Sequence, residues 1–182
     1  EAQRDRFLFK LNVGYPSPEE EREIIYRMGV KPPEPKQILN TEDLLHLQDV
    51  AANVFVHHAL VDYVVRIVTA TREPEKFGMP DAKAWIAYGA SPRASLGIIS
   101  ASRALALVRG RDYVIPQDVV EVIPDVLRHR LVLTYDALAD EISAETVVNR
   151  ILQTVALPQV NAIPQQGHSV PPVMAGAAAT GR

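Results

Sequence analysis

The sequence predicts a mainly α-helical protein, with a bundle of about five helices between Thr41 and Leu157. Apolar residues recur at helical spacing in several segments of this stretch, and Ser, Thr or Pro residues stand where these segments would begin. No part of it shows the alternating pattern that is typical of a strand, so we expect no sheet there.

The first 30 residues predict a short strand followed by a helix. Residues 7–13 form a mostly apolar run that stops at the turn-forming residues 14–16, as is typical of a largely buried strand. Ser17 and Glu20 have the spacing of a capping box, so we expect a helix from there to about Met28.

Proline-rich or low-complexity segments flank the predicted bundle. Residues 31–40 contain three prolines, which favour an extended linker and a domain boundary between residues 1–30 and residues 41–157. Residues 158–182 are rich in Pro, Gly, Ala and Gln and show no apolar period, so we expect a disordered tail.

Within the bundle, the expected helices begin at Thr41, His58, Ser91, Pro116 and Ser143. The first two should pack together. Trp85 and Ile86, in the loop before the third helix, should contribute to the core, and Pro124 should break or kink the fourth helix.

Composition excludes several classes of protein. The 182 residues include no cysteine, which rules out disulfides and thiolate chemistry, and the net charge is −3 with a pI near 6.0. This mild acidity argues against broad binding to nucleic acid. There is neither a long apolar run nor a signal pattern, so we expect a cytoplasmic protein without a membrane span.

The most informative segment is Ser91-Pro92-Arg93-Ala94. Ser91 suits the N-cap of a helix and Pro92 its first position, which puts Arg93 in the first turn. Backbone N–H groups, the helix dipole and a guanidinium would then favour a phosphate at the same place. The alternative is a capped helix whose first-turn arginine only faces water.

Other polar residues give weaker signals. Adjacent His57 and His58 point to different sides of a helix, so we expect capping or surface positions and no metal site. The basic residues 128–130, with Arg103, Arg109 and Arg111, have as many acidic neighbours, which favours a mixed-charge surface over a binding face.

Five segments together resemble the C-terminal half of a MoxR-family AAA+ ATPase. They are Glu1-Ala2-Gln3-Arg4-Asp5-Arg6-Phe7, Gly14-Tyr15-Pro16, Gly89-Ala90-Ser91-Pro92-Arg93-Ala94-Ser95, Arg109-Gly110-Arg111-Asp112-Tyr113-Val114 and Leu127-Arg128-His129-Arg130. Their order and spacing, over about residues 1–156, carry the resemblance. It implies that residues 1–30 are a strand-helix remnant of the α/β AAA+ core and that residues 41–157 form the helical lid.

The resemblance also implies site residues. Arg6 would be the arginine finger that reaches the γ-phosphate of ATP in a neighbouring subunit, with Arg4 as the alternative two residues away. Arg93 would be the sensor-2 arginine, with Ser91 and Ala94 beside the nucleotide.

For the full-length parent, the resemblance implies ATP and Mg²⁺ as cofactors, a hexameric ring, chaperone-like remodelling and von Willebrand factor A-type partner proteins. This chain contains no G-x-x-x-x-G-K-[ST] loop, so we expect it to be inactive alone as an ATPase. Residues 138–141 mimic a Walker B motif but lie among helix formers. The alternative function is a nucleotide-independent α-helical protein-interaction module.

Overall fold

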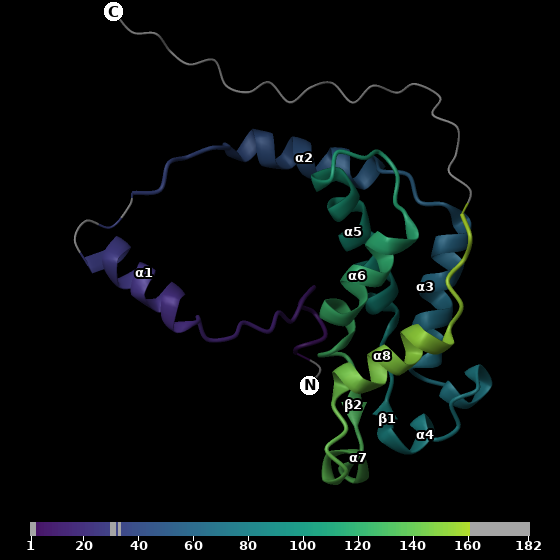
Figure 1. Ribbon diagram of the computed structural model, residues 1–182. Helices are drawn as coiled ribbons and strands as arrows, with labels where there is room; N and C mark the ends of the chain where they lie inside the picture. Colours follow the sequence, from purple (N-terminus) through teal and green to yellow (C-terminus); the bar gives the residue numbers. More distant parts are fainter. Residues whose placement is uncertain (1–2, 30–31, 33, 161–182) are drawn as a thin grey trace, which may run out of the picture.

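The computed structural model describes residues 3–29, 32 and 34–160, and it confirms a mainly α-helical fold (Figure 1). In chain order the elements are α1 (Pro18–Gly29), α2 (Thr41–Asn53), α3 (His58–Ala70), the 3₁₀ helix η1 (Pro74–Phe77), α4 (Ala82–Trp85), β1 (Ile86–Tyr88), α5 (Pro92–Val108), α6 (Pro116–Leu127), β2 (Val132–Leu133), α7 (Tyr135–Ala139) and α8 (Ala144–Thr154). The five longest helices after the linker, α2, α3, α5, α6 and α8, are the five that the sequence predicts.

Helix α5 lies at the centre of the bundle and packs against α2, α3 and α6, while α8 closes the other side against α3 and α6. The apolar faces of α3, α5, α6 and α8 each supply fully buried side chains, among them Leu60, Ile98, Ile123 and Ile151. The helical spacing of apolar residues thus identifies the faces that exclude water.

Local capping signals explain where the helices begin. The hydroxyl of Ser143 accepts from the Thr146 N–H at 3.1 Å at the start of α8. At the start of α3, Nδ1 of His57 accepts from the Ala59 N–H at 3.1 Å. His57 is therefore a helix cap, as expected, and the described residues contain no group of three or more His, Cys, Asp or Glu that could hold a metal ion.

The predicted strand at residues 7–13 is wrong, because the structure has no regular element there. These residues are exposed; Leu11 and Val13 are among the exposed large apolar side chains. A strand forms only beside another strand, and the Lys10 N–H donates instead to the carbonyl of Asp125 at 3.0 Å. The predicted helix that follows is present as α1, which lies apart from the bundle (Figure 1) and has no buried residue.

The expectation of no sheet in the bundle is also wrong. Strands β1 and β2 pair in antiparallel fashion, with Ile86 opposite Leu133. Segments of three and two residues are too short to show an alternating pattern, which is why the sequence does not reveal them. Ile86 is buried and Trp85 is partly buried against the core, as expected.

Two details of helix packing differ from expectation. Helix α2 packs mainly against α5 rather than α3, since the chain after α2 is extended and Phe55 forms a parallel bridge with Tyr113. Pro124 does not break α6, which continues to Leu127 although proline has no N–H to donate to the helix; the alternative expectation, a kink, stays a prediction.

The predicted disordered tail, residues 158–182, lies outside the described residues from position 161 onward. Among the described residues, no helix is both long and apolar enough to cross a membrane. The division of the chain at residues 31–40 stays a prediction.

Candidate functional site

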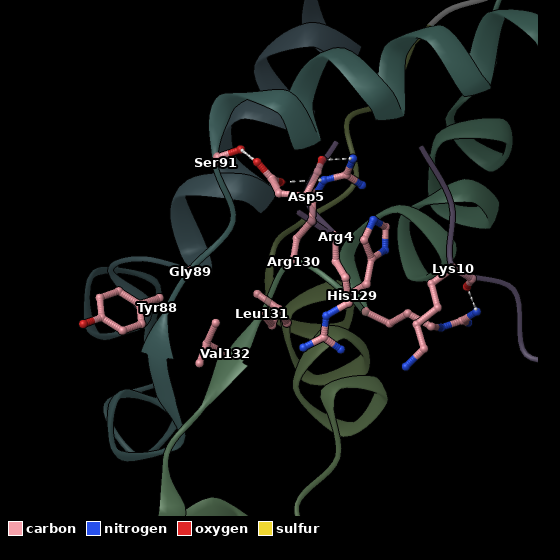
Figure 2. Close-up of a pocket in the computed structure, with 11 residues that line it drawn as sticks. Arg4, Asp5, Lys10, Tyr88, Gly89, Ser91, His129, Arg130, Leu131 and Val132 are labelled. Carbon is pink, nitrogen blue, oxygen red and sulfur yellow. Dashed lines mark hydrogen bonds and ion pairs between the residues drawn. The ribbon is translucent and has the colours of Figure 1, made fainter. Parts of the chain in front are cut away.

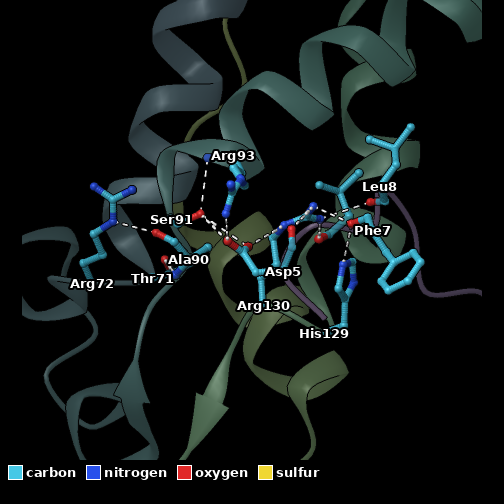
Figure 3. A network of polar contacts seen from close by, with 11 residues as sticks. Asp5, Phe7, Leu8, Thr71, Arg72, Ala90, Ser91, Arg93, His129 and Arg130 are labelled. Carbon is cyan, nitrogen blue, oxygen red and sulfur yellow. Dashed lines mark hydrogen bonds and ion pairs between the residues drawn. The ribbon is translucent and has the colours of Figure 1, made fainter. Parts of the chain in front are cut away.

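The start of α5 has the geometry that the sequence predicts (Figure 3). Ser91 is the N-cap, its hydroxyl accepts from the Arg93 N–H at 3.3 Å, and Pro92 occupies the first helical position. The Ala94 N–H donates to the Ser91 carbonyl at 2.9 Å, and the Ala94 side chain is buried. Because both amides have partners, the guanidinium of Arg93, with 66% of its side chain exposed, is the group that extends from this turn into solvent.

The chain before Ser91 is held tightly against the end of α3. The Ala90 N–H donates to the Thr71 hydroxyl at 2.9 Å, and Arg72 Nε donates to the Ala90 carbonyl at 2.7 Å. A Cβ at Gly89 would lie 2.4 Å from the Thr71 carbonyl oxygen, so only glycine fits. These contacts fix the position of the first turn of α5.

Asp5 joins this turn to the N-terminal segment (Figure 3). Its carboxylate accepts from the Ser91 hydroxyl at 3.0 Å, from Arg93 Nη1 at 3.4 Å and from Arg130 Nε at 3.1 Å. Burial alone would raise the pKa of Asp5, but the hydrogen bonds from Ser91 and Arg93 and the charge of Arg130 outweigh it and lower this pKa below its ordinary value. Asp5 is therefore a carboxylate in the structure.

Arg130 is the buried member of this network, with 3% of its side chain exposed. Besides Asp5 Oδ1, it donates to the carbonyls of Asp5 at 3.1 Å, of Phe7 at 2.6 Å and of Leu8 at 3.0 Å, and to the carbonyl of Val126 in α6. Burial lowers the pKa of Arg130 and Asp5 raises it, but an arginine stays charged in proteins.

The two residues before Arg130 hold the same segment. Arg128 Nη1 donates to the Lys10 carbonyl at 2.6 Å, and His129 Nε2 lies 3.0 Å from the Phe7 carbonyl. A carbonyl only accepts, so Nε2 of His129 carries the hydrogen. Burial is the main cause that lowers the pKa of His129, which favours the neutral ring.

A pocket of about 210 Å³ lies between the N-terminal segment and the strands (Figure 2). Its lining consists of Arg4, Asp5, Lys10, Tyr88, Gly89, Ser91 and residues 128–132. Tyr88 and Val132 lie on one side in Figure 2, and His129 and Lys10 lie on the other. Basic groups outnumber the single carboxylate in this lining.

The structure gives the two finger candidates different surroundings. Both are exposed, but Arg4 lines the pocket, whereas the guanidinium of Arg6 lies 5.5 Å from the centre of the Phe7 ring. Asp5 stands between them and contacts Arg93, so the structure brings the segment that carries both candidates to the start of α5, 88 residues further along the chain.

Sequence reasoning missed the roles of Asp5 and Arg130, although both lie inside segments that carried the resemblance. It also missed the ion-pair cluster around Asp118, whose side chain is fully buried and accepts from Arg111 at 2.6 Å and from Arg109 at 3.1 Å. Arg109 also contacts Glu121 at 2.8 Å. The equal numbers of acids and bases in this region were the one signal for such pairing.

Comparison with known proteins identifies a domain family and several similar proteins. Residues 81–151 match the AAA lid domain family. The chain is 82% identical over 183 aligned residues to Chaperone MoxR1 of Mycobacterium tuberculosis, covering all of this chain and 48% of that protein. It is 37% identical over 162 residues to the uncharacterized protein YeaC of Bacillus subtilis, covering 87% of this chain and 47% of YeaC.

Among solved structures, a "putative ATPase" from Cytophaga hutchinsonii matches with a TM-score of 0.83 and 33% identity, over 87% of this chain and 48% of that one. The fold and the matched domain thus define the lid of an AAA-type ATPase. The chain belongs to the MoxR family of AAA+ ATPases, as the resemblance implied, and it spans about half the length of the curated relatives it matches.

Proposed function

We propose that this chain is the nucleotide-responsive lid portion of a hexameric, cytoplasmic MoxR-type ATPase that remodels client proteins, with von Willebrand factor A-type proteins as partners. Arg93 contacts the phosphates of ATP as the sensor-2 arginine. Arg6 reaches the γ-phosphate bound by the neighbouring subunit as the arginine finger. Hydrolysis then changes the angle of the lid.

One observation carries this proposal: the exposed Arg93 guanidinium stands at the N-terminus of a 17-residue helix whose first turn is held by Ser91. The helix dipole and the permanent charge of arginine both favour a phosphate there. The contact of Arg93 with Asp5 is long, at 3.4 Å, and lies near solvent, so a phosphate with more negative charge can replace it.

The exposed position of Arg6 supports its role as a finger. A residue that acts on a neighbouring subunit must extend from the surface of its own, and Arg6 does so beside Asp5. Arg4 is exposed as well, but it lines the pocket against the lid, which favours Arg6 over Arg4 for contact between subunits.

The described residues suit only part of an ATP site. Arg93 and the start of α5 fit the phosphates, but the sequence has no phosphate-binding glycine loop. ATP with Mg²⁺ supplies the phosphoanhydride bond that is broken. We therefore assign the phosphate loop and the Mg²⁺ ligands to another part of the ATPase.

The test uses the ATPase that includes this lid together with its phosphate-binding core. Arg6→Ala should lower kcat by roughly a thousandfold or more, the range found for arginine fingers, and leave the Kd for ATP within about twofold. Arg93→Ala should weaken ATP binding, and Arg93→Lys should restore it only in part, because lysine lacks the fork. Arg4→Ala is the matched control and should retain kcat.

Two results would contradict the assignment. If Arg6→Ala and Arg93→Ala both hydrolyse ATP at the wild-type rate, neither residue has the role proposed for it. If Arg4→Ala loses most of the activity while Arg6→Ala keeps it, Arg4 is the arginine finger.

A second candidate, a protein-interaction module that needs no nucleotide, is favoured by one observation. Helix α2 has no buried residue, and Leu44 and Leu45 on it are half exposed or more. Such apolar exposure is typical of an interaction site. Client binding that stays constant between ATP, ADP and no nucleotide, and that Leu45→Glu abolishes, would favour this module over the ATPase lid.

A further inference from the structure

We propose that Arg130 is the positioning residue for Arg6: from the turn between α6 and β2 it holds the backbone on both sides of Arg6 in one place on the lid. This inference rests on the proposed role of Arg6 as the arginine finger.

The contacts of Arg130 surround Arg6 in the chain. Nη2 donates to the carbonyls of Asp5 and Phe7, at 3.1 Å and 2.6 Å, and Nη1 donates to the carbonyl of Leu8 at 3.0 Å. Nε donates to Oδ1 of Asp5 at 3.1 Å. Arg130 therefore fixes the residue before Arg6 and the two residues after it, while the Arg6 side chain stays exposed.

These contacts matter because the segment has little else to hold it. Residues 3–10 form no helix or strand, and all of them except the partly buried Asp5 are exposed. Among the described residues, its other hydrogen bonds to the lid run from Ser91 and Arg93 to the Asp5 carboxylate, from His129 to Phe7, from Arg128 to Lys10 and from Lys10 to Asp125. Arg130 donates to three backbone carbonyls within residues 5–8, those of Asp5, Phe7 and Leu8.

Arginine is the side chain that this geometry requires. Its planar fork offers donors in three directions from one rigid group, and each of its three nitrogens has an acceptor here. Its buried charge is balanced by Asp5, whose other oxygen contacts Ser91 and Arg93. Lysine would keep the charge, but its single nitrogen could not reach all of these acceptors at once.

Arg130 and Arg93, the two arginines that contact Asp5, differ in exposure and in number of contacts, and this difference suits a lid that moves. Arg130 is 3% exposed and has many bonds to the segment, whereas Arg93 is 66% exposed and has one long contact with Asp5. Arg93 can leave Asp5 for a phosphate while Arg130 keeps the finger segment in place. The lid and the finger would then move as one body when the nucleotide changes.

The kinetic test compares Arg130→Ala, Arg6→Ala and the double variant in the same ATPase. A displaced finger should lower kcat by about 100-fold in Arg130→Ala, the effect expected of a misplacement near 1 Å, with the KM for ATP within about twofold. Arg130→Lys should restore little of this. In the Arg6→Ala background, Arg130→Ala should change kcat by less than about twofold, because the group it positions is absent.

Arg109→Ala is the matched control, since Arg109 pairs with Asp118 and Glu121 in a separate ion-pair cluster. It should leave kcat within about twofold. A kcat for Arg130→Ala like that of the wild type, or a loss of similar size in both backgrounds, overturns the proposal.

Hydrogen exchange separates this inference from the function on which it rests. The Phe7 amide, which donates to the Arg4 carbonyl at 3.1 Å, should exchange faster in Arg130→Ala and at the wild-type rate in Arg6→Ala. If Arg6→Ala keeps full kcat, the finger assignment is wrong, and Arg130 then positions no catalytic group whatever the exchange shows. Unchanged exchange in Arg130→Ala would show that Arg130 does not hold this segment in place. Where Arg130→Ala does not fold, Arg130→Met, which keeps the apolar stem, is measured in its place.

Discussion

Asp5 and Arg93 lie in contact, with Oδ2 of Asp5 3.4 Å from Nη1 of Arg93, although 88 residues separate them. The same carboxylate contacts the buried Arg130 at 3.1 Å. One carboxylate therefore joins the N-terminal segment, the start of α5 and the turn after α6. The N-terminal segment is thereby part of the lid surface, even though it contains no regular structure.

Asp5→Asn should destabilise the protein, because asparagine keeps the shape of the side chain but removes the charge that balances the buried Arg130. A hydrogen bond to a charged group contributes about 1.5–3 kcal/mol, and we expect a loss in the free energy of unfolding of about that size. Urea unfolding measures it. Asp62→Asn, at an exposed position on α3, is the control and should change stability by less than about 0.5 kcal/mol. Equal stability of the two variants would contradict a structural role for Asp5.

Asp118 should make stability depend on pH in the acid range. Burial alone would raise its pKa, but Arg111, the Ile115 N–H and Arg109 outweigh burial and lower this pKa below the ordinary value of 3.8. A carboxyl with a lowered pKa in the folded state stabilises the fold well above pH 3.8, and this contribution is lost as the pH falls through the lowered value. Burial of the carboxylate between two arginines makes the effect large.

The measurement compares thermal unfolding of the wild type and Asp118→Asn between neutral pH and pH 3. Near neutral pH the variant should be less stable by about 2–3 kcal/mol, below the full cost of breaking a buried pair because both arginines are partly exposed. The difference should shrink as the medium becomes more acidic. A difference that stays constant over this range would show that the charge of Asp118 contributes nothing.

Local signals in the sequence predict local structure well here. Ser91 and Ser143 each precede a helix, and the structure confirms both as N-caps because a cap depends only on the next three residues. The helical bundle follows from apolar spacing within single segments. Residues 7–13 show the limit of such reasoning, because an apolar run indicates a strand only when a neighbouring strand is available.

The candidate site depends on contacts that no local pattern contains. Ser91 and Arg93 are visible as a helix start, but Arg130 meets Asp5 across 125 residues, and β1 meets β2 across more than 40. Nothing in the spacing of either pair indicates a contact. The resemblance to MoxR-type ATPases marked these segments as important without saying what held them together.

Ser91→Ala should cost more stability than Ser143→Ala, although both remove an N-cap. The loss of a cap costs about 1 kcal/mol, and Ser91 also donates to Asp5 at 3.0 Å. In the Asp5→Asn background, where this bond is weakened, the cost of Ser91→Ala should approach that of Ser143→Ala. Urea unfolding of the two single variants and the double variant gives the coupling. Strict additivity would mean that the bond between Ser91 and Asp5 adds no stability.

Gly89→Ala should disturb the start of α5 by steric overlap alone. The added Cβ would lie 2.4 Å from the carbonyl oxygen and 2.6 Å from the carbonyl carbon of Thr71, and backbone atoms cannot move aside as a flexible side chain can. The hydrogen bonds of Ala90 with Thr71 and Arg72 would lengthen as the chain shifts. Overpacking of this kind costs about 1–3 kcal/mol, which urea unfolding would detect.

Gly14→Ala is the control for this change, because a Cβ at Gly14 meets nothing within 4 Å. It should leave stability within about 0.5 kcal/mol. In the ATPase, Gly89→Ala should also weaken ATP binding, since Ser91 and Arg93 follow Gly89 by two and four residues and would shift with it. Normal ATP affinity together with a clear loss of stability would mean that the position of this turn does not control nucleotide binding, and Arg93 would then lose its strongest structural support as the sensor.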